Sequence, residues 1–263
     1  MAFECSSEPY IEVLHYLFIT LDTYDSFQGV PEWTGTLGPF TCALRSGSLE
    51  ARPQEHYRDE QAARAVLDPL LASWEVRALL ESDIRIRFDF QRAVLVKSAS
   101  SGIPGMTRMA GSISGGLSVS GSPTRCHLAY PDPGDVRQLK ATALVKDLLP
   151  WVRQLRSRQP PMLVPGYLLL TRLEWEYGKR AHAAKTLNVS RKILHKFGEL
   201  TAVNDPLERR KIAGDPRSLT EREKEWLIQA AALLTTRVAE FEAGATTTSL
   251  LNMSNLPALA DTP

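Results

Sequence analysis

The sequence has little of what marks a secreted, membrane-spanning or metal-dependent protein. Its 263 residues include only three cysteines, Cys5, Cys42 and Cys126, which lie far apart and form no CxxC pair. They indicate neither a disulfide framework nor a zinc site, and a reducing compartment, the cytoplasm, is the simplest interpretation. The longest apolar runs, such as residues 13–21, are far shorter than the roughly 20 residues that cross a bilayer. The first ten residues lack a basic region followed by an apolar stretch, so we expect no signal peptide and no membrane association.

Patterns typical of catalytic and cofactor sites are also missing. The five histidines show no HxxxH or HExxH spacing, and the sequence has no GxSxG motif. The Ser/Gly-rich stretch 98–122 contains no GxxxxGK[ST], so it predicts no phosphate-binding loop. Asp22, Asp25 and Glu32 could line a pocket, with ordinary turn acids as the alternative. We therefore expect no metal and no cofactor, and we favour a non-catalytic binding function.

The net charge of +1 hides an asymmetry between the two halves of the chain. Residues 1–130 carry 11 Lys and Arg against 15 Asp and Glu, a net charge of −4. Residues 131–263 carry 20 against 15, a net charge of +5. A polyanion would therefore bind to the C-terminal half, if the protein binds one.

Residues 1–130 are predicted to form a β-rich domain with one or two helices. Residues 10–24 are rich in aromatic and β-branched side chains, and residues 83–91 alternate between apolar and polar, as strands do. Residues 40–44 and 48–52 flank Ser46-Gly47 and resemble a hairpin. Residues 58–82 have helical spacing, with either a kink or a restart at Pro69. The stretch 98–122 is either an exposed loop or a pair of thin strands.

Residues 131–243 are predicted to form an α-helical bundle domain, which gives an α+β fold class overall. The break is placed at Tyr130-Pro-Asp-Pro-Gly134. Helices are expected over 135–148, 150–158, 165–177, 180–187, 190–200 and 220–242. Trp74, Trp151, Trp175 and Trp226 all fall on apolar helix faces, so core packing is expected for each. Residues 244–263 read as a flexible tail, in which Leu250-Leu251 and Leu256 are possible docking points.

The stretch 179–200, KRAHAAKTLNVSRKILHKFGEL, has the pattern of a helix–turn–helix. Ala183, Ala184, Leu187, Val189, Leu194 and Phe197 are expected to face inward. Asn188 suits a left-handed turn, and Ser190 suits the N-cap of the second helix. The segment AAKTLNVSRKILHK resembles the AAxxLGISRxTLYRK pattern of the DNA-binding helix–turn–helix of the factor-for-inversion-stimulation type, and the resemblance covers about 15 residues. That resemblance implies a DNA-binding second helix.

The same stretch is strongly cationic, and residues 179–196 contain no acid. The candidate nucleic-acid-binding residues are Lys179, Arg180, Lys185, Arg191, Lys192, His195 and Lys196. In a nucleic-acid complex, Arg191, Lys192 and His195 would reach base edges, and the others would bind phosphates. The alternative is a solvated face of a helical bundle.

The overall layout, with a β-rich half followed by helices containing LxVSRKxLxKxGEL, is similar to bacterial abortive-infection (ApeA-like) and HEPN-superfamily proteins. The resemblance implies a role in phage defence and, in members that cleave RNA, an Arg and a His on the last helix. This chain departs from that pattern, because 220–242 contains no His and Arg191 and His195 lie in a different helix. We therefore expect a bacterial binding or regulatory protein that recognises DNA, RNA or an acidic partner protein. The alternatives are a HEPN-like ribonuclease with an atypical site and a scaffold subunit of a protein complex.

Overall fold

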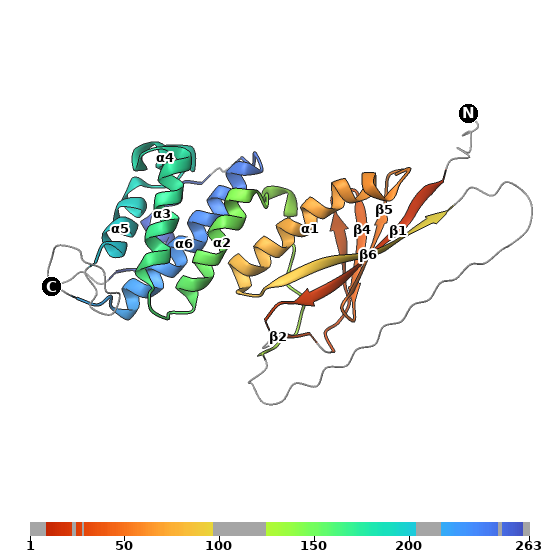
Figure 1. Cartoon of the computed structure of the whole chain (residues 1–263), viewed down its shortest axis with the longest axis horizontal. Coiled ribbons are helices and arrows are strands. Elements are labelled where there is room, and N and C mark those ends of the chain that lie inside the picture. The colour runs from red at the N-terminus through yellow and green to blue at the C-terminus, as the bar shows by residue number, and fades with distance from the viewer. Residues whose placement is uncertain are drawn as a thin grey trace, which may run out of the picture. The chain divides into compact units, whose positions relative to one another are not determined.

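The computed structural model describes residues 9–22, 25–27, 29–96, 125–203, 217–246 and 249–259. It shows an antiparallel five-stranded sheet with a helix, followed by a region of several packed helices (Figure 1). The predicted α+β class is therefore confirmed. The expected loop or thin strands at 98–122 lie outside the described residues. In the described part of the chain, none of the helices combines the length and apolar character needed to cross a membrane.

The chain divides into two compact units. The first, which we call the sheet unit, comprises Met1–Asp68 and Ile84–Pro131. The second, the helical unit, comprises Pro69–Asp83 and Asp132–Pro263. The divisions fall inside helix α1 (Glu60–Ser82), between Asp83 and Ile84 after it, and between Pro131 and Asp132 within the Pro-rich break. The second half of α1 therefore belongs with the C-terminal helices.

The sheet has the strand order β3-β4-β5-β1-β6, and every neighbouring pair is antiparallel. Its strands are β1 (Tyr10–Thr20), β3 (Trp33–Leu37), β4 (Phe40–Arg45), β5 (Ser48–Pro53) and β6 (Ile86–Val96). The predicted hairpin joins β4 to β5, with Ser46 and Gly47 both at positive φ, 48° and 76°. Two successive left-handed residues match the right-handed twist of the flanking strands. A separate parallel pair joins β2 (Asp25–Ser26) to β7 (Arg125–Cys126).

The first half of α1 packs against the sheet. The helix begins directly after Asp59, whose carboxylate accepts a hydrogen bond from the backbone N–H of Ala62 at 2.7 Å. The Tyr16 hydroxyl on β1 donates to Asp68 at 2.5 Å, and the Arg64 guanidinium lies 4.1 Å from the centre of the Phe90 ring on β6. The helix runs through Pro69 without a restart.

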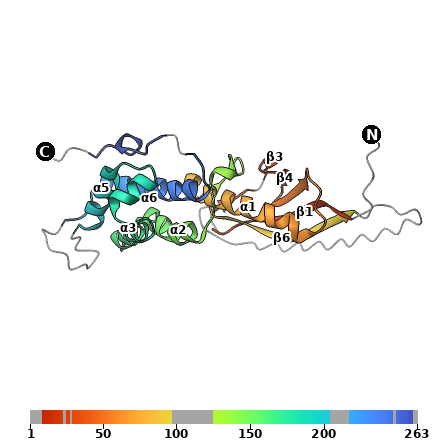
Figure 2. The same ribbon diagram turned by 90° about the horizontal axis from the view of Figure 1, so that it is seen from above.

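The helical unit is built from α2 (Ala143–Arg156), α3 (Leu163–Tyr177), α4 (Arg180–Thr186), α5 (Arg191–Thr201) and α6 (Glu221–Glu242). Figure 2 shows α2 and α3 in one layer and α5 and α6 in another. Trp226 and Phe197 are fully buried between these layers, with ring centroids 6.5 Å apart. A capping box begins α6, in which Thr220 and Glu223 exchange hydrogen bonds.

Two expectations for this unit are wrong in detail. No helix runs over 135–148, because Asp135 caps only a single 3-10 turn and Thr142 caps α2 instead. The helix α2 then continues through Pro150.

Trp175 is also misassigned, because its side chain is 76% exposed rather than part of the core. The buried stripe of α3 includes Leu173 and Tyr177, and a position midway between them points to the opposite face of a helix with 3.6 residues per turn. The Arg172 guanidinium lies over one face of the exposed indole, 4.7 Å from the ring centre. Trp74 and Trp226 are fully buried, as expected.

Candidate nucleic-acid interface

The predicted helix–turn–helix corresponds to α4 and α5. Asn188 has a φ of 51° at the turn, the left-handed conformation expected there. The backbone N–H of Val189 donates to the carbonyl of Ala184 at 2.8 Å and closes the end of α4. Ser190 occupies the N-cap position of α5 with an extended backbone, although its hydroxyl makes no capping hydrogen bond. The local geometry is therefore that of two short helices joined by a tight left-handed turn.

The inner face of this helix pair is packed into the core of the helical unit. All six residues expected to face inward are at most 5% exposed: Ala183, Ala184, Leu187, Val189, Leu194 and Phe197. Burying them leaves the polar positions of both helices on the outside.

The seven candidate cations divide by exposure. Four of them are exposed: Lys179, Lys185, Arg191 and Lys192. The other three are partly buried: Arg180, His195 and Lys196. Among the residues that the structure describes, no acid pairs with Lys179, Lys185 or Lys192. Most of the cationic surface is therefore open to a ligand.

Arg180 has a structural role that its sequence position did not reveal. Its guanidinium donates to Glu174 on α3 at 2.6 Å. It also lies against Gly198 on α5, where an added Cβ would sit 2.7 Å from its nitrogen atoms. Arg180 thus joins three helices, and Gly198 provides the space that it needs. The expected role of Arg180 as a free phosphate ligand does not fit this placement.

The outer face of α5 carries its own polar contacts. The Arg191 Nε–H donates to His195 Nε2 at 2.9 Å, so Nε2 acts as an acceptor and the ring hydrogen resides on Nδ1. Lys196 pairs with Glu199 at 3.3 Å, and the glutamate is 65% exposed. An ion pair this exposed contributes little to stability and exchanges readily for another anion. Lys196 therefore stays accessible, while Glu199 adds an acid at the far end of α5.

The C-terminal segment pairs with the turn of this helix pair. Val189 and Leu251 form a parallel β-bridge, in which Ser190 N–H donates to Leu251 O at 2.7 Å and Leu251 N–H donates to Asn188 O at 3.1 Å. The Asn188 side-chain amide also donates to Ser249 O at 3.3 Å. Leu251 and Leu256 are buried in the helical core, whereas Leu250 is exposed. Part of the segment expected to be a flexible tail thus fixes the start of α5.

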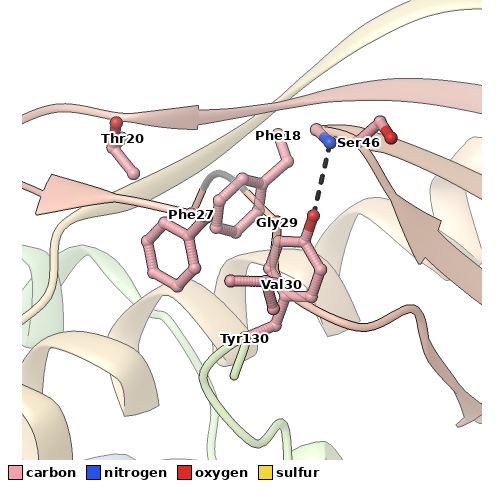
Figure 3. Close-up of a pocket in the computed structure, with 8 residues that line it drawn as sticks. Phe18, Thr20, Phe27, Gly29, Val30, Ser46 and Tyr130 are labelled. Carbon is pink, nitrogen blue, oxygen red and sulfur yellow. Dashed lines mark hydrogen bonds between the residues drawn. The ribbon is translucent and has the colours of Figure 1, made fainter. Parts of the chain in front are cut away.

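A second candidate site is a cavity of about 450 Å³ in the sheet unit (Figure 3). It is lined by Phe18 and Thr20 of β1, the loop residues Phe27, Gly29 and Val30, the hairpin turn Ser46-Gly47, and Tyr130. Figure 3 shows the Tyr130 hydroxyl directed at the hairpin turn, where it accepts a hydrogen bond from Gly47 N–H at 3.4 Å. Nothing in the sequence singled out these residues as a group.

The loop acids proposed as pocket residues do not line this cavity. Asp22 pairs with Arg85 at 3.2 Å, and Glu32 pairs with Arg45 at 3.2 Å. The Asp25 side chain, 2% exposed, contacts His127 Nε2 at 2.8 Å. Asp25 therefore fixes His127, which stacks on the cavity residue Phe27, and does not line the cavity itself.

Among the described residues, no group of three or more His, Cys, Asp and Glu side chains could hold a metal ion. No family model, no curated protein and no solved structure matches the chain.

Proposed function

We propose that this is a non-catalytic bacterial binding protein that holds the phosphate backbone of a double-stranded nucleic acid on the outer face of α4 and α5. The observation that supports it best is the exposed set Lys179, Lys185, Arg191 and Lys192. On α5, Lys192 and Lys196 are spaced i,i+4, and like charges at this spacing repel one another and cost folding free energy. A phosphate backbone would remove this repulsion and release its own counterions.

Each cation has a role in this proposal. Arg191 and Lys192 lie in the first turn of the second helix and would bind phosphates there. Lys179 and Lys185, at the two ends of α4, would bind phosphates on either side. His195 positions Arg191 through their hydrogen bond.

The salt dependence of binding tests the proposal. Four phosphate contacts predict a slope of log K against log salt of about −3.6 for duplex DNA. Fluorescence anisotropy with labelled duplex DNA and duplex RNA over a range of NaCl concentrations measures this slope. Binding that is absent for both duplexes, or that does not respond to salt, would refute the proposal.

A matched set of variants distinguishes binding by this surface from binding that depends only on the net charge of the protein. Lys185→Ala with Lys192→Ala should weaken binding about tenfold or more and flatten the salt slope by about 2. Arg222→Ala removes an exposed cation from α6 instead and should leave binding unchanged. A loss for each charge removed that is as large in Arg222→Ala as in the double variant would show that only net charge matters.

The hydrogen bond between Arg191 and His195 supports a second candidate, a HEPN-like ribonuclease with an atypical site. His195→Ala would then abolish cleavage of RNA. RNA cleavage that survives this change would exclude the candidate. A stoichiometric acidic protein that co-purifies through Lys185 and Lys192 would instead identify the surface as the contact of a scaffold subunit.

The proposal includes a cytoplasmic location and a role in regulation or in phage defence. The free thiols of Cys42 and Cys126 are in keeping with a reducing compartment. The layout that resembles abortive-infection proteins supports the defence role. Survival of phage challenge with the wild-type gene but not with the Lys185→Ala, Lys192→Ala variant would test it.

A further inference from the structure

The cavity of the sheet unit has walls that are held in place before any ligand arrives. The Phe18 ring meets the rings of Phe27 and Tyr130 edge-on, each at 5.2 Å between centroids. The Phe27 ring also stacks on His127 at 4.6 Å, and His127 is fixed in turn by the buried carboxylate of Asp25. Fixed aromatic walls lower the entropy cost of binding a flat apolar molecule.

The Tyr130 hydroxyl of this cavity accepts one hydrogen bond and has its own hydrogen still to donate. Tyr130 is 6% exposed, and its hydroxyl oxygen accepts the long hydrogen bond from Gly47 N–H. Among the described residues, no acceptor receives the hydrogen of this hydroxyl. Because this hydroxyl lines the cavity, it can donate its hydrogen to a ligand oxygen placed within reach.

The size and charge of the cavity narrow the class of ligand. Its volume of about 450 Å³ lies within the range of about 300 to 1,000 Å³ found for small-molecule sites. None of the described residues that line it carries a charge. A charged molecule would lose its hydration there without gaining an ionic partner.

We propose that this cavity binds a small neutral molecule that contains an aromatic ring and a carbonyl oxygen. The ring lies against Phe18 and Phe27, and the oxygen accepts the hydrogen bond of the Tyr130 hydroxyl. This site is independent of the nucleic-acid proposal, because it involves only residues of the sheet unit.

Three simple probes test the ligand class by ligand-detected NMR titration of the full chain. Acetophenone has the ring and the carbonyl oxygen, ethylbenzene has only the ring, and benzoate adds a charge. Acetophenone should bind most tightly, ethylbenzene more weakly, and benzoate should not compete. Absence of acetophenone binding up to its solubility limit, or equal binding of benzoate, would overturn the proposal.

Two variants then locate the site. Tyr130→Phe keeps the ring and removes the hydroxyl, so it should weaken acetophenone roughly 3- to 10-fold, the effect of one hydrogen bond, and leave ethylbenzene unchanged. Val30→Trp should fill the cavity and abolish binding of both probes. Leu128→Ala, at a position 89% exposed, is the control that should change nothing. Should Tyr130→Phe fail to fold, Val30→Trp alone decides, and acetophenone binding to it at wild-type affinity would refute the assignment.

Discussion

Replacing Leu251 with alanine should release residues 249–259 from the turn between α4 and α5 without unfolding the helical unit. Leu251 is 4% exposed and belongs to the core, so losing its side chain should cost about 2 to 3 kcal/mol. Because this segment follows the last helix, it can detach while α2 to α6 stay packed. The Ser190 amide, which donates to Leu251 O, reports the release directly. Its protection from hydrogen exchange should fall roughly 30- to 140-fold, as each 1.4 kcal/mol is a factor of ten.

The neighbouring residue provides a matched control. Leu250 is 51% exposed, so Leu250→Ala should leave Ser190 protection within about twofold of wild type. In Leu251→Ala, the amide of the fully buried Leu234 on α6 should remain far better protected than the Ser190 amide, because it exchanges only when the helices themselves unfold. Unchanged exchange at Ser190 would refute the view that this segment holds the turn. Equal protection of the Ser190 and Leu234 amides in Leu251→Ala would show that the segment opens only with the global fold.

Two further predictions concern single titratable groups. Hydrogen bonds from Arg217 lower the pKa of the Glu223 carboxyl, so this group stabilises the fold above its ordinary pKa of 4.5 and stops doing so as the pH falls through its lowered value. Glu223→Gln should therefore lower the free energy of unfolding by about 1 kcal/mol at neutral pH and leave it unchanged in strong acid. Urea unfolding at a series of pH values measures this difference, and a difference that does not vary with pH would contradict the prediction. Burial raises the pKa of the Cys42 thiol to about 12, whereas Cys126 is exposed. Iodoacetamide at neutral pH should therefore label Cys126 and spare Cys42 until the protein is unfolded. Rapid labelling of Cys42 in the native protein, detected by peptide mass spectrometry, would contradict its burial.

The periodicity of the sequence was sufficient to predict the strands and helices that pack one face against the core. The alternation in β6, the helical spacing of α6 and the Ser46-Gly47 turn each have a local physical cause, and each appears where it was expected. Trp175 shows the limit of this reasoning. Its apolar side chain suggested a place in the core, yet the helical periodicity puts residue 175 on the face of α3 opposite to the core. Arg172, on the previous turn of the helix, contacts one face of the ring.

The candidate site was predictable only in part, because a sequence pattern shows which residues are charged but not which of them form ion pairs. Arg180 and Lys192 look equivalent in the sequence. In the structure, Glu174 on the preceding helix pairs with Arg180, whereas Lys192 is exposed. The contact between Leu251 and the turn joins residues about 60 positions apart, which no local pattern encodes.

The number of unpaired cations also limits what one copy of this chain can do. Counting Lys179, Lys185, Arg191 and Lys192, a single copy provides about four phosphate contacts, below the 6 to 10 typical of tight duplex binders. A helix–turn–helix that recognises a defined sequence usually acts as two copies on two half-sites. A measured salt slope near −3.6 would therefore indicate one copy on the duplex, and a slope near −7 would indicate two copies bound together. The same titration thus tests whether the surface contacts phosphates and how many copies cooperate in the contact.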